Sequence, residues 1–293
     1  MTYPDQVDFH MHTSVSDGSD TPDLILKHVK QAGIEIFSVT DHDALKGCKI
    51  IQSLLNQDDP LFVSGVEFSC RDGEGQYHIL GYGYDPDSAP IRNVVETGHY
   101  YRMKKVYARI EYLRNVCHFS FPREELDALF ALDNPGKPHI ANLMVKYGFA
   151  ETKEQAFLQY LNNICIKNEY VHPEEAIAGI LESGGIPVLA HPCYGNGDQL
   201  ILGDELDRRV QRLMDYGLQG LEGFYSGFSS TLRAQVVALA ERYGLYVTAG
   251  SDYHGTNKMV MLGDTGLDSE AEMPEGFKRF IEAVAGFTNK VKN

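Results

Sequence analysis

Residues 21–43 read TPDLILKHVKQAGIEIFSVTDHD. The opening Thr-Pro pair is typical of a helix N-terminus, and Gly33 is typical of a helix end. The next run, 34–40, is almost entirely apolar, as expected for a strand buried on both faces of a parallel sheet. An Asp-His-Asp cluster, 41–43, stands where that strand ends. The stretch therefore predicts a helix, a buried strand and a polar strand end in succession.

Apolar segments of the same kind recur along the chain. Helical periodicity lies between many of them, for example over Glu174–Ser183 and Ser230–Tyr243. This alternation predicts an α/β fold built of βαβ units, and seven strands predict a closed or nearly closed seven-stranded (β/α)7 barrel. The predicted strands are Val7–Met11, Ile34–Thr40, Leu61–Phe68, His78–Tyr84, Ile186–Ala190, Gly220–Tyr225 and Leu245–Gly250.

One part of the chain breaks the alternation. Residues 89–181 contain helix patterns but no convincing strand. We therefore expect a barrel formed by residues 1–88 and 182–293, with residues 89–181 as a helical insertion that lies over it as a substrate-binding cap. The helices expected in the insertion are Ile91–Val116, Pro122–Ala131, Pro138–Tyr147 and Lys153–Leu161.

The composition disfavours several classes of protein. The 293 residues include 26 Lys and Arg against 41 Asp and Glu, and this net charge of −15 disfavours binding of long nucleic acids through a basic face. No apolar run approaches the ~18 residues of a membrane span, so we expect no membrane partner. The first residues do not read as a secretory signal. Five scattered cysteines without a C-x-x-C pair predict free thiols and a cytoplasmic location.

Side chains that could bind metal gather where the predicted strands end. His10 and His12, two residues apart on one strand, can bind one ion from the same face. Each residue alone has an ordinary alternative role, such as a polar strand end, an Asx-turn at Asp17 or a helix cap at Asp43. Their recurrence favours a functional site, because barrel enzymes build their sites on that face. The candidates are His10, His12, Asp17, His42, Glu67, His78, His191, Asp252 and His254.

This set is typical of a metal centre. Buried carboxylates are costly without a compensating charge, and cations would hold such a cluster together. The absence of a thiolate from the set favours Mn, Fe or Zn at a catalytic site. Nine candidates exceed the ligands of one tetrahedral ion. We therefore expect two or three divalent metal ions, which commonly activate water and bind phosphoryl oxygens.

The strand ends resemble the motifs of the PHP (polymerase and histidinol phosphatase) superfamily of metal-dependent phosphoesterases. The resemblance implies a distorted seven-stranded barrel with its site at the carboxyl ends of the strands. It spans almost the whole chain and keeps the family's order. The matching motifs are DFHMHT (8–13), SDG (16–18), TDHD (40–43), GVEFS (65–69), HILGY (78–82), LAHP (189–192) and GSDYHG (250–255).

The resemblance also implies how the ligands are shared. Every ligand position of the family is filled, which disfavours a metal-free relative. Asp8 and Asp41 would lie behind the ligands and orient the histidines. The implied sets are His10, His12, Glu67 and Asp252 for one ion, Glu67, His78 and His191 for a second, and Asp17, His42 and His254 for a third.

The insertion resembles one branch of the superfamily. Its GKPHIA segment (136–141) is similar to stand-alone enzymes that remove phosphate from nucleoside 3′,5′-bisphosphates or trim short oligoribonucleotides. Lys137 precedes a proline at a predicted helix start, so a cation and free N–H groups would converge on one spot that suits a phosphate. An ordinary exposed lysine is the alternative. His139 would reach the same phosphate or pack inside the insertion.

Two other segments bear on the second phosphate. Many relatives carry a basic segment before the Tyr-Val pair at 170–171, and here that stretch offers Lys167 as a substitute charge. The turn after the sixth strand offers the hydroxyls of Tyr225 and Ser226 but no charge. Specificity for a 3′,5′-bisphosphate is therefore less well supported than the metal centre.

These features predict hydrolysis of a phosphomonoester of a small nucleotide by hydroxide that the metals activate. Asp17, His191 and His254 are the catalytic candidates for handling the leaving group's proton. A histidinol-phosphate phosphatase is the nearest rival, although that branch usually lacks the insertion. An amidohydrolase or deaminase shares the H-x-H start but not the later motifs. A non-catalytic metal- or nucleotide-binding regulatory domain is the third alternative.

Overall fold

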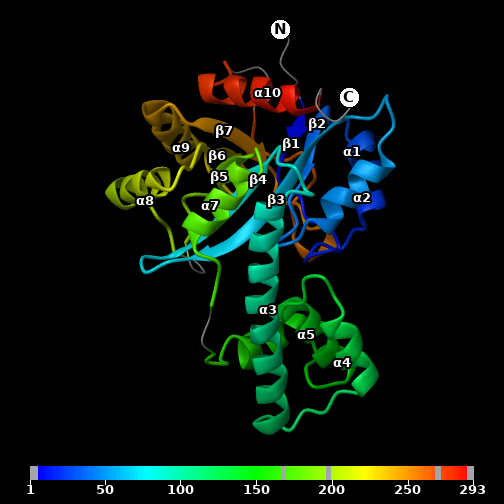
Figure 1. Cartoon of the computed structure of the whole chain (residues 1–293). Helices are drawn as coiled ribbons and strands as arrows, with labels where there is room; N and C mark the ends of the chain where they lie inside the picture. Colours follow the sequence, from blue (N-terminus) through cyan, green and yellow to red (C-terminus); the bar gives the residue numbers. More distant parts are fainter. Residues whose placement is uncertain (1–5, 167–168, 196–198, 268–271, 289–293) are drawn as a thin grey trace.

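A single sheet of seven strands forms the centre of the protein (Figure 1). The computed structural model describes residues 6–166, 169–195, 199–267 and 272–288. The strands follow one another in the sheet in chain order. They are β1 (Val7–Asp8), β2 (Ile36–Val39), β3 (Leu61–Arg71), β4 (Gln76–Tyr82), β5 (Ile186–Leu189), β6 (Gly220–Tyr225) and β7 (Tyr246–Gly250).

The first and last strands meet through hydrogen bonds just beyond β1. The amide of Phe9 donates to the Ala249 carbonyl (2.9 Å), and the amide of His12 donates to the Tyr253 carbonyl (2.8 Å). The sheet thus closes into a nearly complete barrel, which confirms the predicted fold. β1 is shorter than predicted because the chain beyond Asp8 bonds the segment around the end of β7.

β4 departs from the parallel arrangement that βαβ units favour. This strand runs antiparallel to β3 and β5, whereas all other neighbours are parallel. Residues 72–75 alone connect β3 to β4, and a parallel pair needs a crossover of a dozen or more residues. Asp72 stabilises the turn by accepting the amides of Glu74 and Gly75. The reversal brings His78, near the start of β4, to the carboxyl ends of the neighbouring strands.

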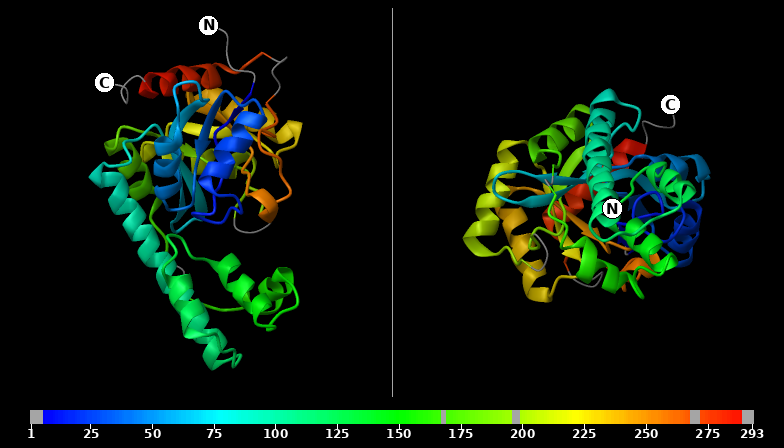
Figure 2. Two further views of the ribbon diagram at one scale, coloured as in Figure 1. Left: turned by 90° about the vertical axis from the view of Figure 1, so that its right-hand side faces the viewer. Right: turned by 90° about the horizontal axis from the view of Figure 1, so that it is seen from below.

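Helices cover the outside of the barrel (Figures 1 and 2). Near one end α10 (Glu275–Thr288) crosses it, and its Phe280 ring lies 5.0 Å from Phe9 and 6.1 Å from Tyr246, the first residue of β7. The amino ends of the strands are therefore covered by apolar packing, and the opposite end is left for polar groups. The other barrel helices are α1 (Pro22–Gln31), α2 (Lys46–Leu54), α7 (Pro173–Glu182), α8 (Gly203–Asp215) and α9 (Ser230–Tyr243).

The helix α3 (Ala89–Asn115) begins against the barrel and continues well beyond it (Figure 2). Its far half packs against the other helices of residues 116–166 in a separate apolar core that includes Val106, Ile140 and Met144. The four helices predicted for residues 91–161 are confirmed. Those that follow α3 are α4 (Arg123–Phe130), α5 (Lys137–Lys146), α6 (Lys153–Gln155) and the π-helix Ala156–Leu161.

The helix α7 lies inside the range predicted for the insertion but packs with the barrel. Its Ala176, Ile177 and Ile180 belong to the barrel core. The division of the chain into barrel and cap stays our proposal. Among the described residues, no helix combines the length and the apolar character that a bilayer crossing requires.

Candidate metal centre

Glu67 lies at the centre of a polar cluster at the carboxyl end of the barrel. It stands on β3 and is 1% exposed. Its two oxygens contact five of the predicted ligands, which come from four different parts of the chain. Its Oε2 lies 3.2 Å from His10 Nε2, 3.1 Å from His12 Nε2 and 3.2 Å from His42 Nδ1, and its Oε1 lies 2.8 Å from His78 Nδ1 and 3.4 Å from His191 Nε2.

Asp252 completes the first implied ligand set. Its Oδ1 lies 3.4 Å from His10 Nε2 and 3.3 Å from His12 Nε2. Together with Glu67, these residues form a group whose ligand atoms all lie within 4.8 Å of one another, and all four residues are buried. The set that the family resemblance implies for one ion is therefore assembled as a compact, enclosed group.

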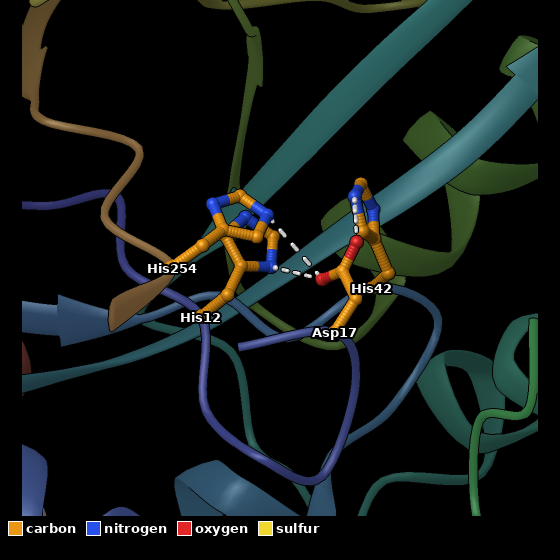
Figure 3. A group of neighbouring side chains, drawn as sticks. All are labelled: His12, Asp17, His42 and His254. Atoms are coloured by element: carbon orange, nitrogen blue, oxygen red, sulfur yellow. Dashed lines mark ion pairs between the residues drawn. The ribbon is translucent and has the colours of Figure 1, made fainter. Parts of the chain in front are cut away.

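Asp17 organises a second group at the more exposed side of the cluster. Its Oδ1 lies 3.5 Å from His12 Nδ1 and 3.4 Å from His254 Nε2, and its Oδ2 lies 3.9 Å from His42 Nε2. Figure 3 shows the carboxylate between the rings of His12 and His254 and the ring of His42. These four residues also fit a metal position.

A third group joins the other two. His42, Glu67 and His78 lie within reach of one ion, and His191 approaches the same Glu67 oxygen as His78. The rings of His78 and His191 lie 5.1 Å apart in an edge-to-face arrangement. All nine predicted ligands thus meet at one end of the barrel, and their assignment to particular ions stays a proposal.

Most of these ligand atoms are buried yet make no hydrogen bond, although buried polar atoms rarely lack partners. Two atoms that share an ion at about 2.1 Å with tetrahedral angles lie about 3.4 Å apart. The contacts of Glu67 and Asp252 with the two first-strand histidines span 3.1–3.4 Å, so the donor set fits divalent metal ions. The unpartnered atoms within the described chain include His10 Nε2, His12 Nε2, Asp17 Oδ1, His42 Nδ1, His78 Nδ1 and both Glu67 oxygens.

Burial disfavours the charged form of every group, and charges inside the cluster exceed this effect at several ligands, whereas at His42 burial prevails and lowers the pKa to about 4. Burial alone would lower the pKa of His12, but Asp252 and Glu67 raise it to about 10. Burial alone would raise the pKa of Glu67, but His42 and His10 hold it well below its usual range. Protonated histidines therefore hold the cluster together before metal binds, and metal must displace their protons.

Two predicted ligands have strained backbones. His191 (φ 30°) and Asp252 (φ 58°) lie in the left-handed region, which costs a non-glycine residue about 1–3 kcal/mol. The Asp252 amide donates to the His10 carbonyl (2.8 Å), and its Oδ2 accepts the hydroxyl of Tyr225 (3.0 Å) and the ammonium of Lys258. These bonds offset the strain and leave Oδ1 directed at the histidines.

Asp8 and Asp41 support the site through backbone and hydroxyl groups rather than through imidazole rings. Asp8 accepts the amides of His10 (3.2 Å), Ser251 (3.0 Å) and Gly263 (2.8 Å). Burial raises the pKa of Asp8 to about 6 despite these bonds. Asp41 accepts the amide and the hydroxyl of Thr13 (both 2.8 Å) and the Ser16 hydroxyl (2.6 Å).

Sequence reasoning missed two residues that contact the predicted ligands. Glu222 is fully buried and accepts Nδ1–H of His10 (2.8 Å) and the amide of His191 (2.7 Å). Lys258 pairs with Asp252. A carboxylate within the apolar GLEGFY strand was the available signal for Glu222, whereas nothing in the sequence marks Lys258.

The predicted substrate-binding residues lie in different places in the structure. Lys137 and His139 line a cleft of about 240 Å³ together with Asp17 and His78 of the cluster. His139 Nδ1 also accepts the amide of Gly136 (3.2 Å) at the start of α5. The Tyr225 hydroxyl donates to Asp252, the Ser226 hydroxyl donates to the Ser251 carbonyl (2.7 Å), and Lys167 lies outside the described residues.

The same cleft contains three cations that sequence reasoning missed. Arg102, Lys105 and Arg109 lie on α3 at a spacing that places them on one helix face. Arg102 pairs with Asp43, and the Lys105 ammonium lies 3.7 Å from the centre of the Tyr170 ring. The cleft therefore has predicted metal ligands on its barrel wall and basic residues on the wall formed by the insertion.

Comparison with known proteins agrees with this geometry. The PHP domain family matches residues 8–171. The chain is 28% identical to the phosphoribosyl 1,2-cyclic phosphate 1,2-diphosphodiesterase of Eggerthella lenta over 85% of this chain and 94% of the relative. It is 27% identical to the 3′,5′-nucleoside bisphosphate phosphatase of Chromobacterium violaceum, over 85% of this chain and 87% of the relative. It is 28% identical to the 5′-3′ exoribonuclease of Salmonella typhimurium, covering 87% of each chain.

A solved structure from Bifidobacterium adolescentis, described as a metal-dependent phosphoesterase, has the same fold. It superimposes with a TM-score of 0.79 at 26% identity and covers 95% of this chain and 96% of its own. The family match, the relatives and the assembled ligand cluster agree with the resemblance of the strand-end motifs. The chain belongs to the PHP family and is a phosphoesterase of the hydrolase class.

Proposed function

We propose that this enzyme hydrolyses a phosphomonoester of a small nucleotide that carries a second phosphate. A nucleoside 3′,5′-bisphosphate or the end of a short oligoribonucleotide meets this description. The metal centre would receive the phosphate that is cleaved, and the basic face of α3 with Lys137 would bind the other. One relative, a 3′,5′-nucleoside bisphosphate phosphatase, bears a name that matches such a substrate, and another, a 5′-3′ exoribonuclease, is named for action on RNA, whose linkages are phosphodiesters.

The observation that carries this proposal is a set of cations without acidic partners. Among the residues that the structure describes, Lys105, Arg109 and Lys137 form no ion pair with a carboxylate. Arg109 is only 8% exposed and its Nε has no partner. Burying a charge without a partner is costly. In a chain of net charge −15, such cations indicate a site for an anionic ligand.

Divalent ions held by the nine ligands would lower the pKa of bound water and neutralise charge on phosphoryl oxygens. The chain's own residues position the substrate: Lys137 stands at the first turn of α5, where free N–H groups also favour an anion. His254 Nδ1 donates to the Asp252 carbonyl (2.9 Å). The ring then presents the lone pair of Nε2 to the predicted metal position beside Asp17. Asp17, His191 and His254 stay proposed for the proton of the leaving oxygen.

A substrate panel tests this proposal. The purified protein is loaded with Mn²⁺, and phosphate release is measured from nucleoside 3′,5′-bisphosphates, mononucleotides, short oligoribonucleotides, histidinol phosphate and an aryl phosphate. We expect the bisphosphates or oligoribonucleotides to give the highest kcat/KM. Release only from histidinol phosphate would replace the proposed substrate class, and no release from any compound would overturn the phosphomonoesterase proposal.

A further inference from the structure

We propose that Glu222 is a positioning residue that fixes two metal positions at once. Its two carboxylate oxygens bond two different predicted ligands, His10 and His191, which the family resemblance assigns to different ions. The inference rests on the proposed ligand sets but not on the identity of the substrate. Glu222 itself would bind no metal.

The first bond sets the tautomer of His10. Glu222 Oε1 lies 2.8 Å from His10 Nδ1, and an ionised carboxylate can only accept, so Nδ1 must carry the proton. The lone pair of the neutral ring is then on Nε2, the atom that faces Glu67 (3.2 Å) and Asp252 (3.4 Å). A histidine fixed in this way presents the correct nitrogen to a metal.

The second bond holds the backbone of His191. This residue has φ 30°, a conformation that a non-glycine residue keeps only where its surroundings impose it. Its amide donates to Glu222 Oε2 (2.7 Å) at the end of β5. The ring that follows this backbone lies 3.4 Å from Glu67 Oε1 through Nε2. Loss of the bond would release the loop that carries the ring.

An irregularity in strand β6 orients the Glu222 side chain toward these two partners. The pairing with β7 shifts between Glu222 and Phe224, which marks a bulge at Gly223. The extra residue places Glu222 and Tyr225 on the same face, whereas regular alternation would separate them. A side chain at Gly250 would place a Cβ 2.2 Å from the His10 Cβ and 2.6 Å from Glu222 Oε1, so only glycine leaves room for the pair.

A Glu222→Gln substitution would preserve shape but not the bonding pattern. The amide offers one acceptor and one donor, whereas His10 Nδ1–H and the His191 amide are both donors. One contact would therefore become donor against donor. Either His10 would turn its protonated nitrogen toward the metal position, or the His191 loop would shift.

The test measures Mn²⁺ affinity without any substrate, by titration calorimetry on metal-free protein. We expect Glu222→Gln to raise the Kd for Mn²⁺ by roughly 10–100-fold. The substitution should change the melting temperature of the metal-free protein little. The rise in melting temperature on addition of Mn²⁺ should be smaller in the variant than in the wild type. A Kd within twofold of the wild-type value would overturn the proposal. Because no substrate is used, this outcome is distinct from a failure of the proposed phosphatase activity.

Thr248→Val is the matched control. Thr248 is buried and pairs with Glu222 across β6 and β7, but its hydroxyl bonds no predicted ligand within the described chain. The wild-type Kd should be retained in this variant, and an increase equal to that of Glu222→Gln would indicate general damage to the strands and contradict a specific role.

A measurement on the wild-type protein keeps the proposal testable if the Glu222 variant does not fold. Nitrogen NMR of the Zn²⁺-loaded protein, with labelled histidine, reports which ring nitrogen carries the proton. We expect His10, assigned through the His10→Gln variant, to be protonated on Nδ1. Protonation on Nε2 would overturn the proposal.

Discussion

The two walls of the cleft achieve charge balance in opposite ways. On the barrel wall, three carboxylates are surrounded by six histidines, and both signs of charge are buried together. On the insertion wall, Lys105, Arg109 and Lys137 form no ion pair within the described residues. The first wall contains both signs of charge, whereas the cations of the second are left to pair with an anionic ligand.

Under the proposed function, the barrel wall serves the chemical step and the insertion wall serves substrate specificity. The barrel residues come from short motifs at the strand ends, which resemble those of the PHP superfamily. The basic residues come from the helices α3 and α5, which lie outside the barrel sheet. We therefore expect substitutions on the barrel wall to abolish metal binding and turnover together, and substitutions on the insertion wall to change substrate affinity alone.

The largest effect should come from Glu67→Gln. The amide would replace the carboxylate that contacts five predicted ligands, so metal content and turnover should both fall, the latter by on the order of 10³-fold or more. Metal analysis and phosphate release measure the two losses. The exposed Glu74→Gln on the following turn is the control. Full metal content with full turnover in Glu67→Gln would remove the distinction between the walls.

Arg109→Met should have the next largest effect. Loss of a buried charged hydrogen bond to phosphate costs about 1.5–3 kcal/mol, so KM for a bisphosphate should rise by roughly 10–100-fold with kcat and metal content unchanged. Steady-state kinetics measure KM and kcat, and metal analysis measures the metal content. Lys104→Met on the same helix is the matched control, because Lys104 is exposed and pairs with Glu169 away from the cleft lining. Equal KM changes in both variants would indicate a general charge effect.

The pH dependence of kcat/KM should reflect deprotonation of the Lys105 ammonium. Burial and the neighbouring Arg102 lower its pKa to about 8, so the free enzyme loses this charge as pH rises through that value. For a bisphosphate, kcat/KM should therefore fall several-fold between pH 7 and 9. Lys105→Arg keeps its charge throughout this range and should remove the fall. A fall that persists unchanged in Lys105→Arg would assign the titration to another group.

The smallest effect concerns protons released by metal. His12, whose pKa is raised to about 10, and His10, whose pKa is raised well above its usual value, are both protonated near pH 7 without metal. Mn²⁺ should therefore release protons from these rings when it binds. Calorimetry in buffers of different ionisation enthalpy counts them. Release of none would contradict the account of how the barrel wall balances its charge.

The sequence was sufficient to predict the barrel and the meeting of the nine candidate ligands at one end of it, because both depend on local patterns. Buried parallel strands are continuous apolar runs, and a ligand at a strand end stands out against them. The direction of β4 could also have been inferred, since residues 72–75 are too few for a crossover.

The residues that were missed have no such local signal. Arg102, Lys105 and Arg109 have the spacing of an ordinary solvated helix face, and only packing of the insertion shows that they line a cleft. Glu222 is a single acidic residue in an apolar strand, and its partners lie far away in the sequence. The position of Lys137 at a helix start could be predicted because a proline follows it, and its role toward substrate stays a proposal.

The central claim is that the insertion wall selects substrates with a second phosphate. The most direct test is the ratio of kcat/KM for a nucleoside 3′,5′-bisphosphate to that for the mononucleotide lacking the second phosphate, in the wild-type protein and in Arg109→Met. We predict a ratio of at least ~10 in the wild type that falls toward 1 in the variant. A wild-type ratio near 1, or a high ratio that survives the substitution, would contradict the account.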